Sequence, residues 1–475
     1  MTAEEERILL RERNREREEH VKHIPVLQEV IKQLTEQVKE QQERVAKTSQ
    51  KSSLPPSSDR FVRQKKARNL RRQSGKKPGG QRGHQGHRLQ MRAEPTEVLP
   101  LAPVTRCQHC QADVNEIAAV SIEARQVIDV PAPQPLLVSQ DESQWKRCPH
   151  CQGSTSALFP EDVSAPVQYG PRRASLAVSV LTQQLLPRRR TRDMLSDLLG
   201  VSMSEGTLTT LIKRAARILI PVEEQIKAAL RRTQVIHPEE SGLSVCSRRI
   251  WMHVTSTRHV MHYQVHRSRG HQAIDDDGLL PHVQGTSVHD AWAASFRYKC
   301  QHSLCCVHLL RELRFLSQEM GLWWAVKMER VLLAMTRATR GAWNGPRQRS
   351  PPGARFLALL DEGDRVHPHI PTPKGKRGRA KQHPARNLLD RLRTPQDAVL
   401  AFLSDLDVPF ENNLAERDLR MINVQPKVSG TFRSDEGATG FARIRGYLST
   451  LRKQGRPLFP ALEATLRGQP VLPSF

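Results

Sequence analysis

The chain has 475 residues, a formal net charge of +25 at pH 7 and a pI near 10.3. That length accommodates several domains, and so much positive charge predicts a polyanionic partner, most simply nucleic acid. No run of 18 apolar residues occurs, which excludes a membrane-spanning helix. The acidic N-terminus lacks the apolar stretch of a secretion signal. We therefore expect a cytoplasmic protein with no membrane partner.

The N-terminal residues 1–50 predict a helix with a heptad repeat. Two series recur every seven positions: Ile31, Val38 and Val45 are all apolar, and Leu27 and Leu34 are followed by the polar Gln41. β-Branched residues in one series with mostly Leu in the other are typical of parallel coiled-coil dimers. We therefore expect a homodimer or a higher oligomer. The alternative is one amphipathic helix docked on the rest of the chain.

Residues 51–98 predict a flexible basic arm. Eleven Lys and Arg residues and no Asp or Glu lie between Arg60 and Arg88. A segment of this composition stays unfolded and follows phosphates electrostatically, although a solvated tail without a fixed partner is the alternative. The candidate DNA contacts in the arm are Arg63, Lys65, Lys66, Arg68, Arg71, Arg72, Lys76 and Lys77.

Two Cys-x-x-Cys pairs lie in residues 99–160. Four of the eight cysteines form them, and these four are Cys107, Cys110, Cys148 and Cys151. Two such turns can present four thiolates to one tetrahedral Zn²⁺, so the segment predicts a zinc-binding module. Between the pairs, Gln126–Val130 and Leu136–Val138 have the composition of strands. The alternative is four free thiols paired by chance.

Residues 161–232 predict a helical domain. Met194–Leu199 is apolar, Gly200 ends that helix, and Ser204 is placed to cap the next one. This helix–turn–helix pattern, among many arginines, suits a reader of duplex DNA. A plain helical hairpin between two domains is the alternative.

Residues 233–298 are rich in strand signals. Ile250–Val254 and Val260–Val265 predict a β-hairpin, and Thr286–His289 predicts a short strand that ends at Asp290. Residues 303–345 are expected to be helical, and residues 345–386 are expected to be a loop. The helices predicted after them are Leu388–Leu392, Gln396–Leu406, Ala415–Met421, Ile444–Gln454 and Phe459–Leu466.

Three acidic positions lie at or near the ends of these predicted strands and helices. Glu239 or Glu240 follows the first strand, Asp290 ends a later strand, and Glu416 opens a helix after the helical insertion. Three carboxylates that hold two Mg²⁺ ions are the usual machinery for cutting and joining a phosphodiester. The order predicts a ribonuclease-H-like α/β core interrupted by an all-helical insertion.

Asn412–Arg420 surrounds the last of these acids. Asn412 or Asn413 is expected to cap the helix of Glu416 with its side chain. The alternative for this window is an ordinary surface helix in which Arg420 pairs with Glu416.

From about Leu27 to Gly468 the chain resembles transposases of the insertion sequence 66 family. The segments that carry the resemblance are Ser52–Asp59, Lys77–Gly86, the two Cys-x-x-Cys pairs, Arg269–Gly270, Val288–Asp290, Cys305–Leu313, Asn412–Arg420, Val428–Gly437, Arg443–Arg445 and Arg452–Gly455. The resemblance implies a DDE-type transposase of a bacterial insertion sequence that binds the terminal repeats and catalyses metal-dependent cleavage and strand transfer.

The resemblance also assigns roles and partners. It implies Asp290 and Glu416 as the second and third acids around Mg²⁺ (or Mn²⁺), and the four paired cysteines as Zn²⁺ ligands. The implied partners are duplex DNA at the element ends and the target, and accessory proteins of the same element. The implied location is the bacterial cytoplasm, in association with the nucleoid.

The first acid departs from the family pattern. Where the family has Asp-Glu-Thr-Gly-Leu, this chain has Glu239-Glu240-Ser241-Gly242-Leu243, preceded by Pro238. The extra methylene moves a carboxylate by about 1 Å, which can cost roughly 100-fold in rate. Two hypotheses follow: Glu239 still binds metal, or the chain is an impaired relic that only binds DNA. A zinc-dependent transcription regulator, the third, explains residues 1–216 and leaves Asp290 and Glu416 unexplained.

A second group of metal-ligand residues lies near the start of the insertion. Cys305 and His308 are expected to be buried there and to support the active site, and a second metal bound with Cys300, His302 and Cys306 is the alternative. Basic residues near the third acid are expected to neutralise DNA phosphates. These are Arg417, Arg420, Lys427, Arg433, Arg443 and Arg445.

The sequence therefore predicts an α+β, multidomain and mostly helical protein. The expected domains are a coiled coil (1–50), a basic arm (51–98), a zinc-binding module (99–160), a helical domain (161–232), a catalytic core (233–455) with an insertion at about 303–405, and a C-terminal helix and tail (456–475).

Overall fold

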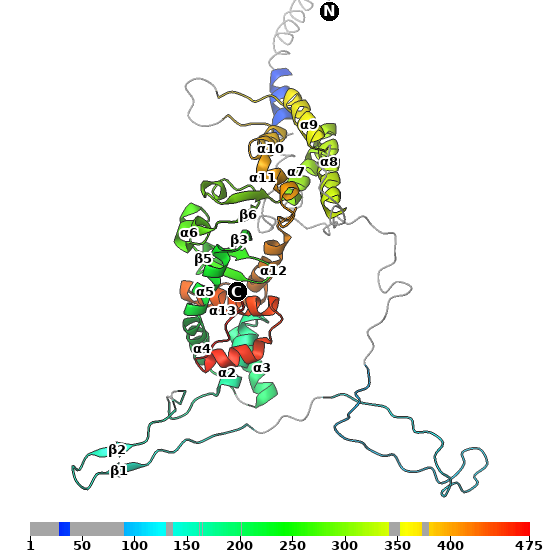
Figure 1. Ribbon diagram of the computed structural model, residues 1–475, viewed down its shortest axis with the longest axis vertical. Coiled ribbons are helices and arrows are strands. Elements are labelled where there is room, and N and C mark those ends of the chain that lie inside the picture. Colours follow the sequence, from blue (N-terminus) through cyan, green and yellow to red (C-terminus); the bar gives the residue numbers. More distant parts are fainter. Residues whose placement is uncertain are drawn as a thin grey trace, which may run out of the picture. The chain divides into compact units, whose positions relative to one another are not determined.

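A computed structural model describes residues 28–38, 90–129, 136–160, 162–163, 165–200, 202–341, 352–372 and 380–475. The chain divides into two compact units: Lys66–Asp141 is one, and Met1–Lys65 together with Glu142–Phe475 is the other. The fold is α+β, roughly half helical, with a mixed sheet (Figure 1). None of the helices in the described ranges is long and apolar enough to cross a membrane.

Residues 28–38 are helical, as the heptad pattern predicts. Ile31, Leu34 and Val38 are all more than half exposed. This stretch is therefore not buried against any other described segment, which disfavours the docked-helix alternative. Leu27, Gln41 and Val45, which would complete the heptad series, lie outside the described residues, so the coiled coil stays a prediction.

The strands expected between the cysteine pairs are absent from the described residues. Gln126–Asp129 and Leu136–Val138 have no regular structure, and Val127 and Leu137 are almost fully exposed. Strand propensity reflects packing on a neighbouring strand and a core, and these residues have neither. The short antiparallel pair β1 (Trp145–Arg147) and β2 (Ser154–Ser156) lies around the second cysteine pair instead.

A five-stranded mixed sheet forms the centre of the larger unit, in the order β5-β4-β3-β6-β7. β3, β4 and β5 are antiparallel neighbours, and β6 and β7 are added in parallel next to β3. The bounds are β3 (Val235–Val245), β4 (Arg248–Ser256), β5 (Met261–His266), β6 (Thr286–His289) and β7 (Gln301–Leu304). The predicted hairpin and the predicted strand before Asp290 are confirmed.

Pro238 does not interrupt the central strand. The sequence predicts that a proline here weakens an interior strand, because it removes a ladder N–H. β3 nevertheless runs through Pro238, which is paired with Thr255 on β4, and the pairing with β6 has already ended at Ile236. Pro238 is therefore no sign of a broken core.

Helices from distant parts of the chain pack on the antiparallel half of the sheet. α12 (Asn413–Ser429) and α13 (Asp435–Lys453) bury Leu419 and Phe441 against Leu243, Met252 and other residues of β3–β5. β-Strand side chains alternate between faces, so the odd-numbered residues of β3, Glu239 among them, point to the α12 side.

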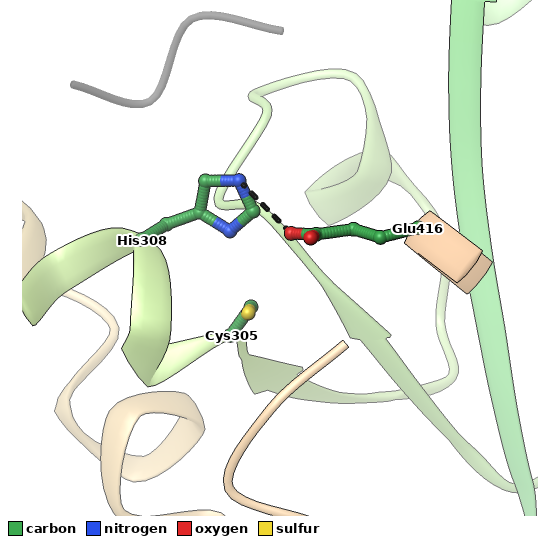
Figure 2. Close-up of side chains that lie close together, drawn as sticks. All are labelled: Cys305, His308 and Glu416. Carbon is green, nitrogen blue, oxygen red and sulfur yellow. Dashed lines mark ion pairs between the residues drawn. The ribbon is translucent and has the colours of Figure 1, made fainter. Parts of the chain in front are cut away.

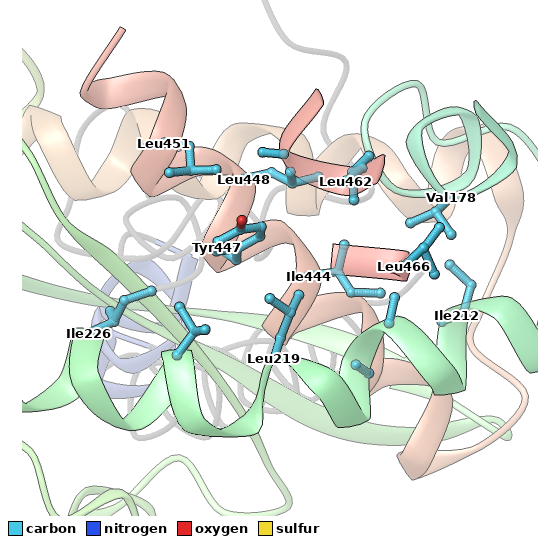
Figure 3. Packing of buried hydrophobic residues seen from close by; sticks show 14 of the residues in the cluster. Val178, Ile212, Leu219, Ile226, Ile444, Tyr447, Leu448, Leu451, Leu462 and Leu466 are labelled. Carbon is cyan, nitrogen blue, oxygen red and sulfur yellow. The ribbon is translucent and has the colours of Figure 1, made fainter. Parts of the chain in front are cut away.

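A second apolar cluster joins α13 to the helices that precede the sheet (Figure 3). Tyr447 and Leu448 of α13 lie among Leu219, Ile212 and Leu462 from three other segments. The helices involved are α2 (Pro171–Thr182), α3 (Arg188–Leu199), α4 (Glu205–Ile218), α5 (Ile220–Arg231) and α14 (Leu458–Leu466), and the short α6 (His271–Asp277) follows β5.

The predicted helix–turn–helix pattern has the expected local geometry. α3 ends at Gly200, whose φ of 67° is left-handed, and the Ser204 hydroxyl accepts a hydrogen bond from the Thr207 N–H at 3.0 Å. Leu208 and Ile212 of α4 are buried in the cluster with α13. The helix pair is thus part of the larger unit's core, and its role as a DNA reader remains a prediction.

The segment between β7 and α12 is a group of helices around its own core (Figure 1). They are α7 (Cys306–Met320), α8 (Trp323–Gly341), α9 (Pro352–Val366), α10 (Pro384–Arg393) and α11 (Gln396–Ser404). The expectation of a loop over 345–386 is wrong for α9. Its Phe356, Leu359 and Leu360 are buried on one helix face, a short apolar stripe that the Pro- and Lys/Arg-rich flanks obscure.

Candidate active site

Glu239 and Asp290 lie on neighbouring parallel strands. Glu239 is in β3, and Asp290 directly follows β6, which pairs with the start of β3. Burial and the charge of Glu240 raise the pKa of Asp290 to about 6. Burial, followed by the charges of Glu240, Asp290 and Glu416, raises the pKa of Glu239 well above its usual range. The predicted acids therefore gather within electrostatic reach of one another.

Glu416 reaches this place from the first turn of α12 (Figure 2). One carboxylate oxygen lies 3.7 Å from Nε2 of His308, and the other lies 3.5 Å from Nη2 of Arg311. Both partners come from α7, at the start of the insertion. Because Glu416 is engaged with α7, the surface-helix alternative with an Arg420–Glu416 pair does not describe this window.

Asn412 connects the strand of Glu239 to the helix of Glu416. Its side-chain Nδ2 donates to the Pro238 carbonyl at 2.9 Å and to Oε2 of Glu239 at 3.1 Å. Its Oδ1 lies 2.9 Å from Nδ1 of His237, and its backbone N–H donates to Sγ of Cys305 at 3.1 Å. The residue is fully buried. Strand β3, the start of α7 and the start of α12 therefore meet at this residue.

The expected capping role of this asparagine is wrong. Asn412 is the N-cap residue of α12, yet its side chain makes no capping hydrogen bond, because it is bound to β3. Asn413 lies inside the helix. Sequence reasoning treated the two asparagines as interchangeable caps and missed Asn412 as a site residue. The signal in the sequence is the pair Asn412-Asn413, because a helix cap needs only one asparagine and the other is free for a different role.

Glu240 takes a different environment from its neighbour. Successive strand residues point to opposite faces, and Glu240 is bound to the guanidinium of Arg269, which lies over the rings of Trp251 and Trp292 at 5.2 and 4.8 Å. Burial raises the pKa of Glu240, and Arg269 opposes this rise. Of the two candidate first acids, Glu239 is thus the one in contact with Asn412 at the start of α12.

Cys305 and His308 are both buried at the start of α7, as predicted. Burial raises the pKa of the Cys305 thiol to about 12 and lowers the pKa of His308 to about 3. One ligand atom from each of Cys305, His308 and Glu416 lies within 4.8 Å of the other two.

The other members of the predicted cysteine–histidine cluster lie elsewhere. The Cys306 thiol faces the Val399 carbonyl at 3.5 Å, His302 faces His289 at 3.1 Å, and Cys300 belongs to the cluster of α2–α5 and α13. The five-residue cluster considered from the sequence does not form.

The basic residues expected near the third acid separate into two groups. Arg417, Arg420, Lys427 and Arg433 are exposed on or just after α12. Two others, Arg443 and Arg445, are bound within the protein. Their predicted role as phosphate contacts is therefore corrected. Arg443 pairs with Glu223 at 2.6 Å, and Arg445 is 4% exposed and donates to the Thr182 carbonyl at 2.7 Å. The arm residues Arg63 to Lys77 lie outside the described residues.

The two Cys-x-x-Cys turns have the same local geometry. In the first, the Cys107 N–H donates to the Ala112 carbonyl, and the Gln111 N–H donates to the Cys107 carbonyl. In the second, the Cys148 N–H donates to the Gly153 carbonyl, and the Gln152 N–H donates to the Cys148 carbonyl. In each turn, backbone N–H groups facing the first sulfur lower its pKa, which favours the thiolate that binds zinc. The turns belong to different compact units, and the shared zinc site remains a prediction.

The three acids have the donor chemistry of a site for a divalent cation. Oxygen ligands from carboxylates are those that Mg²⁺ and Mn²⁺ prefer. Burial is the largest cause of the raised pKa values of Glu239 and Asp290, and the charges of neighbouring carboxylates raise them further. A bound cation would favour the charged form of both groups. The residues that would hold the ion are Glu239, Asp290 and Glu416.

Comparisons with known proteins agree with this geometry. The model of a transposase family, the IS66 family, matches residues 166–440, which is more than half of the chain and includes all three acids. The model of a family of unknown function (DUF6444) matches residues 4–90. No curated protein matches the chain. The chain belongs to the IS66 family of transposases.

Proposed function

We propose that this chain binds the terminal repeats of its insertion sequence, cleaves there, and joins the freed 3′ ends to target DNA with Mg²⁺ or Mn²⁺. The observation that carries the proposal is the convergence of Glu239, Asp290 and Glu416 from three distant segments. These three segments all lie within the match to the transposase family.

We also infer that the core is ribonuclease-H-like. The support is the sheet order, with three antiparallel strands followed by two parallel strands. The first acid lies on the central strand, the second follows the neighbouring parallel strand, and the third lies on a helix packed on the sheet. The helices α7–α11 interrupt this core between the second and third acids.

The roles of the residues follow from their contacts. When bound, the cations activate a water or 3′-hydroxyl and neutralise the charge on the leaving oxygen. Glu239, Asp290 and Glu416 would hold the cations, and Asn412 fixes the carboxylate of Glu239 against the start of α12. The exposed Arg417, Arg420, Lys427 and Arg433 bind backbone phosphates and hold the DNA across the carboxylates.

The longer first acid is compatible with this role. Glu239 has one more methylene than the family's aspartate, and its Oε2 is held by Asn412 at 3.1 Å. A side chain fixed in this way loses less of its positional precision than a free one. This contact supports a working ligand over an impaired relic. A zinc-dependent regulator would leave the convergence of the three acids without a role.

The test is Mg²⁺-dependent strand transfer on DNA that carries the element's own ends, with end binding measured in parallel. The chain as written and Glu239→Asp are expected to join DNA, whereas Asp290→Asn and Glu416→Gln should bind ends normally and join none. Activity from Glu239→Asp alone would identify a transposase silenced at its first acid. End binding without joining by either protein would favour the binding-only relic.

We further propose that Cys107, Cys110, Cys148 and Cys151 share one Zn²⁺, because both turns have the local geometry of thiolate ligands. Dimerisation through residues 1–50, contact of the basic arm with phosphates and cooperation with accessory proteins of the element complete the proposal. A reader role for α3 and α4 belongs to it as well.

A further inference from the structure

We propose that Cys305, His308 and Glu416 form a Zn²⁺ site, and that Zn²⁺ bound there takes the third acid away from Mg²⁺. The proposal rests on the proposed function, because Glu416 is one of the three acids that hold Mg²⁺. It adds a second, inhibitory metal to the same place.

The geometry places three ligand types around one point. One ligand atom from each residue lies within 4.8 Å of the others, and Nε2 of His308 is 3.7 Å from Oε1 of Glu416. Figure 2 shows the His308 ring, the Glu416 carboxylate and the Cys305 thiol at the corners of a triangle. Cys305 and His308 share the first turn of α7, so their separation is fixed by that helix.

The donor set selects the metal. Mg²⁺ takes oxygen ligands and keeps near-ideal octahedral geometry, so a thiol and an imidazole are poor ligands for it. Zn²⁺ is bound by Cys, His and Glu in tetrahedral sites, and three protein ligands leave a fourth position for water. The trio therefore discriminates against the very ion that the three carboxylates prefer.

Two buried polar atoms point to a missing ligand. Nδ1 of His308 and Oε1 of Glu416 are buried without a hydrogen-bond partner among the described residues, and the His308 side chain is only 9% exposed. Buried polar atoms are normally satisfied, and leaving one unsatisfied costs free energy. In Figure 2 the ring nitrogen that is not joined to Glu416 is directed toward Cys305. A metal between these groups would satisfy both atoms.

The surroundings resemble those that support metal ligands. The backbone N–H of Asn412 donates to Sγ of Cys305 at 3.1 Å. Such an outer hydrogen bond orients a ligand, and here it opposes the rise in the thiol pKa that burial causes. Cys305 is also the N-cap residue of α7, where the helix dipole favours negative charge. Arg311 holds the second oxygen of Glu416 at 3.5 Å, which leaves Oε1 for the metal.

The consequence is competition for one carboxylate. Glu416 cannot complete the Mg²⁺ site while it is bound to Zn²⁺ with Cys305 and His308. Zn²⁺ is therefore expected to inhibit strand transfer at concentrations far below that of Mg²⁺, because soft ligands increase its affinity.

The first test is metal binding by the full-length protein, without DNA. Zn²⁺ stoichiometry is measured by competition with a chromophoric chelator, and Co²⁺ substitution reports thiolate coordination by absorption. Cys305→Ser and His308→Asn should each lose one equivalent of metal relative to the chain as written, and Cys305→Ser should lose part of the Co²⁺–thiolate band. Serine retains an acceptor for the Asn412 N–H, so Cys305→Ser is the gentler of the two variants.

Cys306→Ser is the matched control. Its thiol is a buried neighbour on the same helix turn but faces Val399, so its metal content should equal that of the chain as written. Equal Zn²⁺ stoichiometry and affinity in Cys305→Ser, His308→Asn and the unaltered chain would overturn the proposal. Melting curves of all variants confirm that the comparison is made on folded protein.

The second test measures inhibition. The Zn²⁺ concentration that halves each protein's own strand-transfer rate should rise about 10-fold or more in Cys305→Ser, as expected for loss of one ligand, and should not change in Cys306→Ser. Unchanged inhibition in Cys305→Ser would contradict the competition. If no strand transfer occurs at all, the proposed function fails, while the binding test still decides whether the Zn²⁺ site exists.

Discussion

The side-chain amide of Asn412 donates a hydrogen bond to Oε2 of Glu239 at 3.1 Å across 173 positions of sequence. The same amide group donates to the Pro238 carbonyl, and the residue begins the helix that carries Glu416. The position of the first acid is therefore tied to that of the third through one buried side chain. Neither acid needs to touch the other for their separation to be fixed.

This relationship predicts a positioning role for Asn412. Asn412→Ala should lower the strand-transfer rate by about 10- to 100-fold, because a small displacement of a ligand has costs of that order. The Mg²⁺ concentration needed for half-maximal rate should rise, and end binding should be unchanged. Asn413→Ala is the control, because Asn413 is only half-buried and lies within the helix. A loss of rate with no change in the Mg²⁺ requirement would point to a purely structural role.

The burial of Glu239 beside other carboxylates predicts a stabilising substitution. The pKa of Glu239 is raised in the folded protein by burial and neighbouring carboxylates. The free energy of unfolding therefore falls as the pH rises from the ordinary glutamate pKa, near 4.3, through the raised one. Glu239→Gln removes this loss, so metal-free protein should melt about 2 °C higher or more at pH 8 and should show no gain at pH 4.

Glu240→Gln is the control for this effect. Arg269 is bound to Glu240 and opposes the rise in its pKa, and removing this carboxylate leaves a partly buried guanidinium without its partner. Glu240→Gln should therefore raise the melting temperature less than Glu239→Gln does. Equal stabilisation by both substitutions would show that the repulsion is not centred on Glu239. Thermal unfolding in the presence of a chelator makes the measurement.

Metal binding is expected to depend on pH through Asp290. Its pKa of about 6 means that the carboxyl is protonated in acid and must release a proton to bind a cation. Mn²⁺ affinity measured by titration calorimetry should therefore fall steeply as the pH is lowered from 7 to 5. Asp290→Asn should bind weakly at both pH values with a flatter dependence. A constant affinity over this range would exclude Asp290 as a ligand.

The two groups of arginines should respond differently to alanine substitution. Arg445 is buried and donates to the Thr182 carbonyl, so Arg445→Ala should destabilise the fold by about 1–3 kcal/mol. Arg420 is exposed on α12, so Arg420→Ala should leave stability unchanged, weaken binding to all DNA sequences and reduce the salt dependence by about one phosphate contact. Melting curves and binding at several salt concentrations separate the two outcomes, and a sequence-selective loss in Arg420→Ala would contradict its role.

The exposed apolar stripe of residues 28–38 predicts self-association. Leu34→Asp places a charge on the side chains expected to meet in a dimer, and sedimentation should show dissociation. Gln33→Asp, one position away on the same helix, should leave the assembly intact. A Leu34→Asp protein that remains dimeric would show that another surface holds the chains together.

Features that depend on local pattern can be predicted from the amino-acid sequence of this chain. Alternating apolar residues predicted the β-hairpin, the short segment Thr286–His289 before Asp290 predicted β6, and the glycine and serine at 200 and 204 predicted the junction of α3 and α4. The order of the acids predicted which residues gather. These signals are short-range, because periodicity, turn residues and caps act within a few positions of the chain.

Contacts between distant segments follow from how the folded elements pack. Whether Glu239 or Glu240 faces α12 depends on the register of β3, and the bond from Asn412 to Glu239 exists because the N-terminus of α12 packs against that strand. Arg445 has a side chain of the type that contacts phosphates, yet it is buried in the core. Side-chain direction follows from packing between elements, and local sequence carries no record of which distant surface an element will meet.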